Sequence, residues 1–115
     1  MARVALTAVA SSESGVDLDA VDQAAEITDG NGFVWTPTRR FYVLNGDDAS
    51  LTVGIPTAAT VGRSTLAVAD LSQAMSAGTR RVFGPFGQEF RQADGTVHIN
   101  YTGTTPTGVM VAALD

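Results

Sequence analysis

The chain has 115 residues, of which 44% are hydrophobic and 17% charged, a composition typical of one globular domain with its own core. The net charge is −5 and every cation is an arginine. We therefore expect no binding of nucleic acid, because that affinity depends on neutralising phosphates. The absence of cysteine excludes disulfides, thiol nucleophiles and zinc–thiolate sites.

No stretch of the sequence approaches the roughly 18 apolar residues of a membrane-spanning helix. The first ten residues also lack the sustained apolar run of a signal peptide. We expect a protein that is made in the cytoplasm and does not bind a membrane.

The N-terminal part of the chain carries the weakest structural signal. Apolar residues alternate only weakly over Val4–Ala8, and we expect residues 1–12 to form an N-terminal arm. Between residues 12 and 27, apolar residues at helical spacing and Ser14 as a cap favour a short helix. Gly15 and the aspartates of this segment favour a long loop equally well, so both interpretations stay open.

The rest of the chain has the pattern of short strands separated by turns. Apolar and polar residues alternate in Leu51–Ile55 and Val97–Tyr101, which predicts half-buried strands. Phe41–Leu44 and Val109–Leu114 are apolar on both faces, so we expect central or covered strands there. Further strand-like runs are Phe33–Trp35, Leu66–Val68 and Arg80–Phe83.

Turn residues predict how these strands connect. Asn45–Asp48 predicts a hairpin into the next strand, and the last strand is expected to form a hairpin with its predecessor. Turns at intervals of about 8–12 residues are typical of sandwiches and barrels. We therefore expect one all-β domain over residues 1–115. Its predicted form is an antiparallel β-sandwich, jelly-roll-like or immunoglobulin-like, with about eight short strands.

The structural core is expected to consist of large apolar side chains on the inner faces of these strands. They are Phe33, Trp35, Phe41, Val43, Leu51, Val53, Phe83, Phe86, Val97, Ile99 and Tyr101.

No constellation of residues predicts catalysis. His98, the single histidine, falls on the polar face of a strand, with no partner that would orient it as a base. The acidic cluster in Asp17–Glu26 lacks the glycine and the final glutamate of a calcium loop. The glycine-rich Asp29–Gly32 precedes an extended run instead of a helix, which argues against a phosphate cradle. We expect no enzyme, no cofactor and no metal.

The aromatic residues leave two uses open. Trp35 and Tyr42 are suited to the sugar-stacking platform of a carbohydrate-binding β-sandwich module. Alternatively, Phe33, Trp35 and Phe41 are core anchors, which a domain of this size needs.

The string Arg80–Gly87 is the most distinctive local feature. Gly84-Pro85 and Gly87 force the chain to turn. Arg80 and Arg81 are suited to a partner's carboxylates, or they protect a strand edge from aggregation. The residues expected to contact a partner are Arg3, Leu6, Arg39, Arg80 and Arg81.

Several motifs follow one another in order over residues 29–114. They are Gly30-Asn31-Gly32-Phe33, Arg40-Phe41-Tyr42-Val43-Leu44-Asn45-Gly46, Leu51-Thr52-Val53, Ala77-Gly78, Arg81-Val82-Phe83-Gly84-Pro85-Phe86, Gln92-Ala93-Asp94-Gly95-Thr96-Val97 and Val109–Leu114. This ordered set resembles small virion structural proteins of tailed bacteriophages, especially those of actinobacteria, of the capsid decoration or minor head type. The Gly-Pro-Phe followed by Asp-Gly-Thr-Val is its most specific part.

The chain departs from that group in places. The group often has an Asn-Asp-Gly turn where Trp35–Thr38 stands here, and a lysine where Leu44 precedes Asn45-Gly46. The acidic stretch Ser12–Ile27 has no counterpart. These differences concern the partner surface more than the strand order.

The resemblance implies a non-enzymatic protein of the virion, located in the capsid. Its partners would be the major capsid protein or other virion proteins, with self-association as a further option. A second hypothesis places the chain at the head–tail joint or on the tail. A decoration protein needs a rigid scaffold, a low-charge docking face and an arm or loop. Weak contacts are sufficient for it, because many copies bind together.

Overall fold

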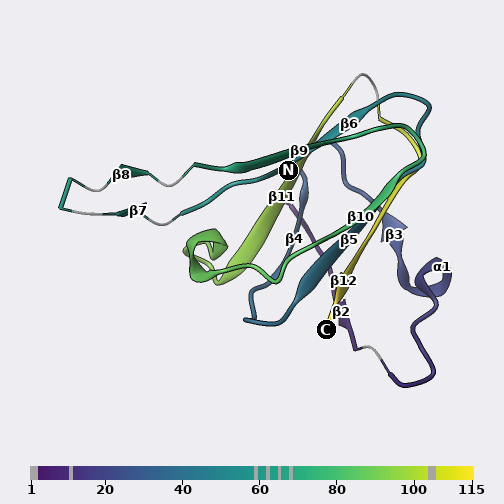
Figure 1. Cartoon of the computed structure of the whole chain (residues 1–115), viewed down its shortest axis with the longest axis horizontal. Coiled ribbons are helices and arrows are strands. Elements are labelled where there is room, and N and C mark those ends of the chain that lie inside the picture. Colours follow the sequence, from purple (N-terminus) through teal and green to yellow (C-terminus); the bar gives the residue numbers. More distant parts are fainter. Residues whose placement is uncertain are drawn as a thin grey trace.

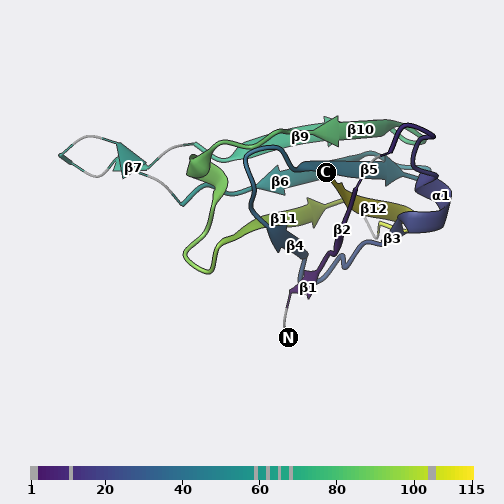
Figure 2. The ribbon, with the colours of Figure 1, turned by 90° about the horizontal axis from the view of Figure 1, so that it is seen from below.

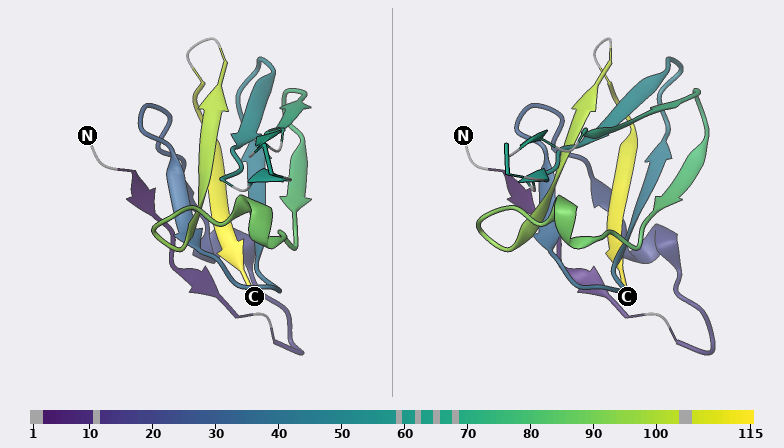
Figure 3. Two further views of the ribbon diagram at one scale, coloured as in Figure 1. Left: turned by 90° about the vertical axis from the view of Figure 1, so that its left-hand side faces the viewer. Right: turned by 60° about the vertical axis from the view of Figure 1, so that its left-hand side comes forward.

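The computed structural model describes residues 3–10, 12–58, 60–61, 63–64, 66–67, 69–103 and 106–115. Strands make up 43% and helices 7% of the described structure, which confirms the all-β class. Two mixed five-stranded sheets pack face to face as a sandwich (Figures 1 and 3).

The first sheet, named here the β11 sheet, has the order β1-β4-β11-β6-β9. Its strands are β1 (Val4–Ala5), β4 (Asn31–Val34), β11 (Thr96–Thr102), β6 (Leu51–Ile55) and β9 (Leu71–Met75). The β9 strand was not predicted, because Leu71 and Met75 are its only large apolar residues and a glutamine lies between them.

The second sheet, named the β5 sheet, has the order β10-β5-β12-β2, with β3 also paired to β12. Its strands are β10 (Arg80–Phe83), β5 (Arg40–Asn45), β12 (Val109–Leu114), β2 (Ala8–Val9) and β3 (Gln23–Ala24). The pairs β1–β4 and β2–β12 are parallel, so the prediction of a purely antiparallel sandwich is wrong in this detail.

Strands β7 (Thr60–Val61) and β8 (Leu66–Ala67) form a separate two-stranded ribbon between β6 and β9. Figure 1 shows this ribbon projecting from the body of the molecule. The predicted run Leu66–Val68 therefore lies partly in β8, and its last residue is outside the described residues.

Both predicted hairpins are wrong. The turn at Asn45–Asp48 leads from β5 to β6, and these strands lie in opposite sheets. Strand β12 likewise pairs with β5, β2 and β3 instead of with its predecessor β11. Both connections are arches across the sandwich. The apolar residues on both faces of β5 and β12 account for this arrangement, because such strands favour the centre of a sheet.

The predicted N-terminal arm is also wrong for its described part. Val4–Ala5 pair with β4 of one sheet, and Ala8–Val9 pair with β12 of the other. The N-terminal segment therefore crosses between the edges of both sheets. Of the predicted segment 12–27, only α1 (Leu18–Val21) is α-helical, and Asp17 caps it in place of Ser14. The remaining helical turn is η1 (Gln88–Phe90).

The core lies between the sheets. Ten of the eleven residues expected there are buried, and the exception is Trp35, which is half-buried. The Trp35 indole N–H donates to the carbonyl oxygen of Phe86 at 3.0 Å, so the ring lies at the rim of the core with its polar atom paired. The rings of Phe33 and Phe41 are stacked, 5.9 Å apart, and join the two sheets.

The outer side of the β5 sheet is covered in its centre. Tyr42 and Ala112 point away from the core cluster, yet only 2% and 4% of their surfaces are exposed. The segment that carries α1 lies on this side (Figure 1). The hydroxyl of Tyr42 has no hydrogen-bond partner among the described residues.

Asn45, fully buried at the end of β5, joins the arches at one end of the sandwich. Its side-chain amide N–H group lies 3.1–3.2 Å from the carbonyl oxygens of Ala49, Met75 and Ser76. Its side-chain oxygen accepts from the Asp47 N–H at 3.2 Å. One side chain therefore satisfies backbone groups of the β5–β6 and β9–β10 connections together.

The third connection, β11 to β12, meets the first at two points. Gly46 N–H donates to the carbonyl oxygen of Gly108 at 3.2 Å, and a Cβ on Gly46 would collide with that oxygen. The Asp47 carboxylate accepts from the Thr107 N–H at 3.3 Å.

Asn45→Ala is expected to lower the free energy of unfolding by about 2–4 kcal/mol, because it leaves several backbone groups without their partner. Urea unfolding measures the loss as a lower midpoint with an unchanged m-value. Ser50→Ala, at an exposed position in the same connection, is the control and should stay within about 0.5 kcal/mol of the parent chain. Equal midpoints for both variants would contradict the role given to Asn45.

Candidate functional site

The outer side of the β11 sheet is formed by small or uncharged side chains. Val97, Ile99 and Tyr101 of β11 are buried, so the alternate residues of this strand point outward. The same alternation on β4, β6 and β9 defines what we call the uncharged face. It consists of Gly32, Val34, Thr52, Gly54, Ser72, Ala74, Thr96, His98, Asn100 and Thr102.

Strand register makes this face continuous. Asn100 lies beside Gly54, which lies beside Ser72 on the next strand. Thr102, Thr52 and Ala74 form a parallel row. The ten residues of the uncharged face include no Asp, Glu, Lys or Arg, although the chain carries twelve acidic residues and seven arginines. The only titratable group on it is His98. Two charged side chains reach its end from outside these strand positions, Arg3 beside Asn100 and Asp94 beside Thr96.

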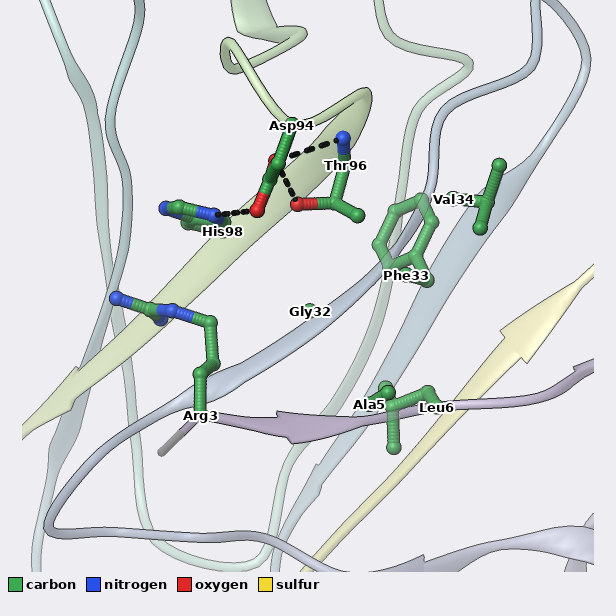
Figure 4. A pocket seen from close by; sticks show the side chains of 9 residues that line it. All are labelled: Arg3, Ala5, Leu6, Gly32, Phe33, Val34, Asp94, Thr96 and His98. Carbon is green, nitrogen blue, oxygen red and sulfur yellow. Dashed lines mark hydrogen bonds and ion pairs between the residues drawn. The ribbon is translucent and has the colours of Figure 1, made fainter. Parts of the chain in front are cut away.

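A shallow pocket of about 180 Å³ lies at one end of the uncharged face. It is lined by Arg3, Ala5, Leu6, Gly32, Phe33, Val34, Asp94, Thr96 and His98. Figure 4 shows the polar groups of Arg3 and His98 on one side and the apolar Leu6, Phe33 and Val34 on the other. A pocket of this size takes one side chain more readily than a cofactor, since ligand sites usually measure about 300 Å³ or more.

Arg3 closes this end of the sheet. Its Nη1 donates to the carbonyl oxygens of Asn31 and Ile99 at 3.1 and 2.9 Å and to Oδ1 of Asn100 at 2.9 Å. Gly30 and Gly32 leave the space in which the arginine lies, because a Cβ on either would press against it. Arg3 thus joins β4 to β11. The sequence analysis expected Arg3 to contact a partner, and in the structure its hydrogen bonds stabilise the sheet.

Asp94, Thr96 and His98 form the polar wall of the pocket. The Thr96 hydroxyl and N–H donate to Oδ1 of Asp94 at 2.6 and 3.1 Å, and His98 Nε2 lies 3.4 Å from Oδ2. These bonds, first that of the Thr96 hydroxyl, lower the pKa of the exposed Asp94 carboxyl. The threonine hydroxyl is committed to this turn as a donor, so the group orders the start of β11.

The residues expected to contact a partner do not form one surface. Leu6 is 6% exposed and packs in the core, although part of its side chain lines the pocket. The N-terminal segment passes from the edge of one sheet to the edge of the other, and Leu6 lies between these two pairings, against the core. Arg80 and Arg81 lie exposed on β10. Figure 2 shows β10 on the opposite side of the molecule from β1, the strand that follows Arg3 in the sequence.

Arg39 connects Asp115 to the end of β4. Its Nε and Nη2 donate to both carboxylate oxygens of Asp115 at 2.8 and 3.0 Å, and its Nη1 donates to the Val34 carbonyl oxygen at 3.0 Å. The Arg39 guanidinium lowers the pKa of the Asp115 carboxyl. Its bonds therefore lie within the molecule.

The aromatic side chains do not form a sugar platform. The five Phe, two Tyr and one Trp all fall within the described residues, and each of these side chains is buried or half-buried. Trp35 is half-buried and lines a second pocket with Gln88 and Arg91. It is a single ring, so the exposed aromatic row expected of a carbohydrate-binding module is not found among the described residues.

In the part of the chain that the structure describes, no group of three or more His, Asp or Glu side chains is placed to hold a metal ion. No helix in the same ranges has the length and apolarity needed to cross a membrane.

The sequence pattern predicted which residues of two strands point outward, but it did not predict this face as a contact surface. The outward residues of β6 and β11 follow from their alternation. Ser72 and Ala74 were missed because β9 was not recognised. That β11 lies between β4 and β6 follows from pairing between distant segments, which periodicity does not reveal.

Comparisons of the chain with protein-family models, with curated proteins and with solved structures find no match.

Gly30→Ala tests the packing of Arg3. Gly30 and Gly15 both have positive φ angles, +80° and +88°, but only Gly30 is crowded, by Arg3 and the Ile99 carbonyl oxygen. Gly15→Ala should therefore cost about 1–2 kcal/mol of backbone strain. Gly30→Ala should cost about 1–3 kcal/mol more, because of overpacking. Urea unfolding compares the two variants, and equal losses would contradict the packing described here.

Acid titration tests the Asp94 turn. Because the pKa of Asp94 is lowered from 3.8 in the folded chain, its contribution to stability is present above that value. It is lost as the pH falls through the lowered pKa. Thr96→Val removes the largest cause, so the pKa of Asp94, followed by carboxyl NMR, should rise. An unchanged pKa would show that the hydroxyl does not stabilise the carboxylate.

Proposed function

We propose that the chain is a non-enzymatic structural protein of a tailed-phage virion, of the capsid decoration or minor head type. In this proposal it binds the shell built by the major capsid protein. The observation that carries the proposal is the uncharged face, a continuous outer surface whose own residues include no Asp, Glu, Lys or Arg. The charged Arg3 and Asp94 lie only at its end, around the pocket. The ordered motifs from Gly30 to Leu114 support the choice of a phage virion as the partner.

A face of this kind is suited to docking because little polar surface must be desolvated without compensation. Burying an unpaired charge costs several kcal/mol, whereas Thr, Ser and Asn side chains exchange water for neutral hydrogen bonds. The interior cores of interfaces are likewise depleted of charged residues.

The size of the face favours a multivalent role. With strands about 4.8 Å apart and about 3.3 Å per residue, four strands give a projected area of roughly 300 Å². A standard interface buries about 800 Å² on each partner, so one copy binds weakly. Repetition over a symmetric shell compensates, because many linked weak contacts act together.

Cryo-electron microscopy of particles assembled with and without this chain tests the proposal. The expected result is density on the outside of the capsid that is missing from particles lacking the chain. Loss of density at the head–tail joint or on the tail would replace the capsid role by the alternative virion location. Identical particles would contradict a virion role altogether.

A pair of variants tests the face itself. Ala74→Arg places a charge in the uncharged face, and Thr38→Arg places the same charge in an exposed turn outside it. Ala74→Arg is expected to empty the sites on the particle, and Thr38→Arg to leave them filled. Full occupancy by Ala74→Arg would show that another surface makes the contact.

A further inference from the structure

Strand β10 is an edge strand, because among the described strands it pairs with β5 alone. Figures 2 and 3 show it at the margin of the sandwich. Arg80, Arg81 and Val82 are all exposed, and 54% of the Val82 surface is accessible. Only Phe83, at the end of the strand, enters the core.

A glycine bulge determines which backbone groups of β10 point away from β5. Gly78, with φ of +75°, donates its N–H to the Asn45 carbonyl oxygen at 2.8 Å, while the Asn45 N–H donates to Thr79 O at 2.9 Å. This is the pattern of a G1 bulge. Antiparallel alternation from Thr79 then turns the N–H and C=O groups of Arg80 and Val82 to the open edge.

The charge on this edge is unusual for the molecule. The chain has a net charge of −5, and Arg39 already binds the carboxylate of Asp115. Arg80 and Arg81, in contrast, have no carboxylate within ion-pair distance among the described residues. Arg80 and Arg81, whose side chains alternate between the two faces of the strand, thus flank a short run of outward-pointing backbone donors and acceptors.

We propose that β10 is a docking edge for an extended, acidic segment of another protein, which adds to the β5 sheet as a further strand. Main-chain bonds to Arg80 and Val82 would supply affinity, and carboxylates opposite the arginines would supply specificity. A second copy of this chain is a poor occupant, because β10 pairing with itself brings arginines of both copies together.

The proposal does not depend on the virion role. The uncharged face and β10 share no residue and lie on different sheets. Failure at one surface therefore leaves the other untouched.

The test uses the full chain and two short capped peptides that alternate Thr or Val with either Glu or Lys. NMR amide shifts follow the titration at Arg80 and Val82. We expect the acidic peptide to bind at this edge and the basic peptide not to bind. Arg80→Glu combined with Arg81→Glu should weaken binding of the acidic peptide by at least about tenfold, and added salt should weaken it for the parent chain.

Val82→Pro separates strand addition from simple charge attraction. Proline removes an N–H that points away from β5, a position at which edge strands tolerate it. Val82→Thr keeps the N–H and is the matched control. We expect Val82→Pro to lose binding and Val82→Thr to retain it, with both folds verified from the core amide spectrum.

Three outcomes would overturn the proposal. Equal binding by the proline variant would show that no strand is added. Equal binding of the basic peptide would remove the charge argument. Absence of peptide binding, with aggregation of the double arginine variant, would show that the arginines only protect the edge. If Val82→Pro does not fold, the arginine variant and the basic peptide still decide the result.

Discussion

The burial of Asn45 is the constraint on which much of this fold depends. A sandwich whose strands alternate between sheets must send connections across its ends, where their backbone groups leave water. At one end the β5–β6, β9–β10 and β11–β12 connections come together. Asn45 supplies both a donor and an acceptor at that point and binds Ala49, Met75, Ser76 and Asp47. Because the same residue anchors the bulge before β10, it also sets the register of the exposed edge strand.

A second buried asparagine, Asn31 of β4, also hydrogen-bonds to several segments of the chain. Asn31 accepts from the Tyr101 hydroxyl at 2.7 Å and from the Glu26 N–H at 3.0 Å, and its amide donates to the Val4 carbonyl oxygen. Burial raises the pKa of Tyr101, so the phenol stays protonated and keeps donating. The two asparagines thus tie irregular segments to the sheets without placing a charge inside.

Residue patterns predicted the local features of this fold better than its connections. Alternation located β6 and β11, and the apolar β5 and β12 proved central in their sheet. The hairpins were wrong because the turn sequence Asn45–Asp48 is compatible with an arch as well as with a hairpin. Whether a hairpin or an arch forms depends on which strands, distant in the sequence, pair and pack with the two strands that the turn connects. For the same reason the sequence indicated the outward residues of β6 and β11 but not the face that they form with β4 and β9. The exposed Arg80 and Arg81, in contrast, could be selected from the sequence.

The alternation of strands between the two sheets has a consequence for how the molecule comes apart. Apart from β6 and β9, which the ribbon joins, consecutive long strands lie in opposite sheets. No contiguous fragment therefore contains a complete layer, and most pairings link residues distant along the chain. A topology dominated by such distant contacts forms slowly. The molecule should then unfold as one cooperative unit and not one sheet at a time.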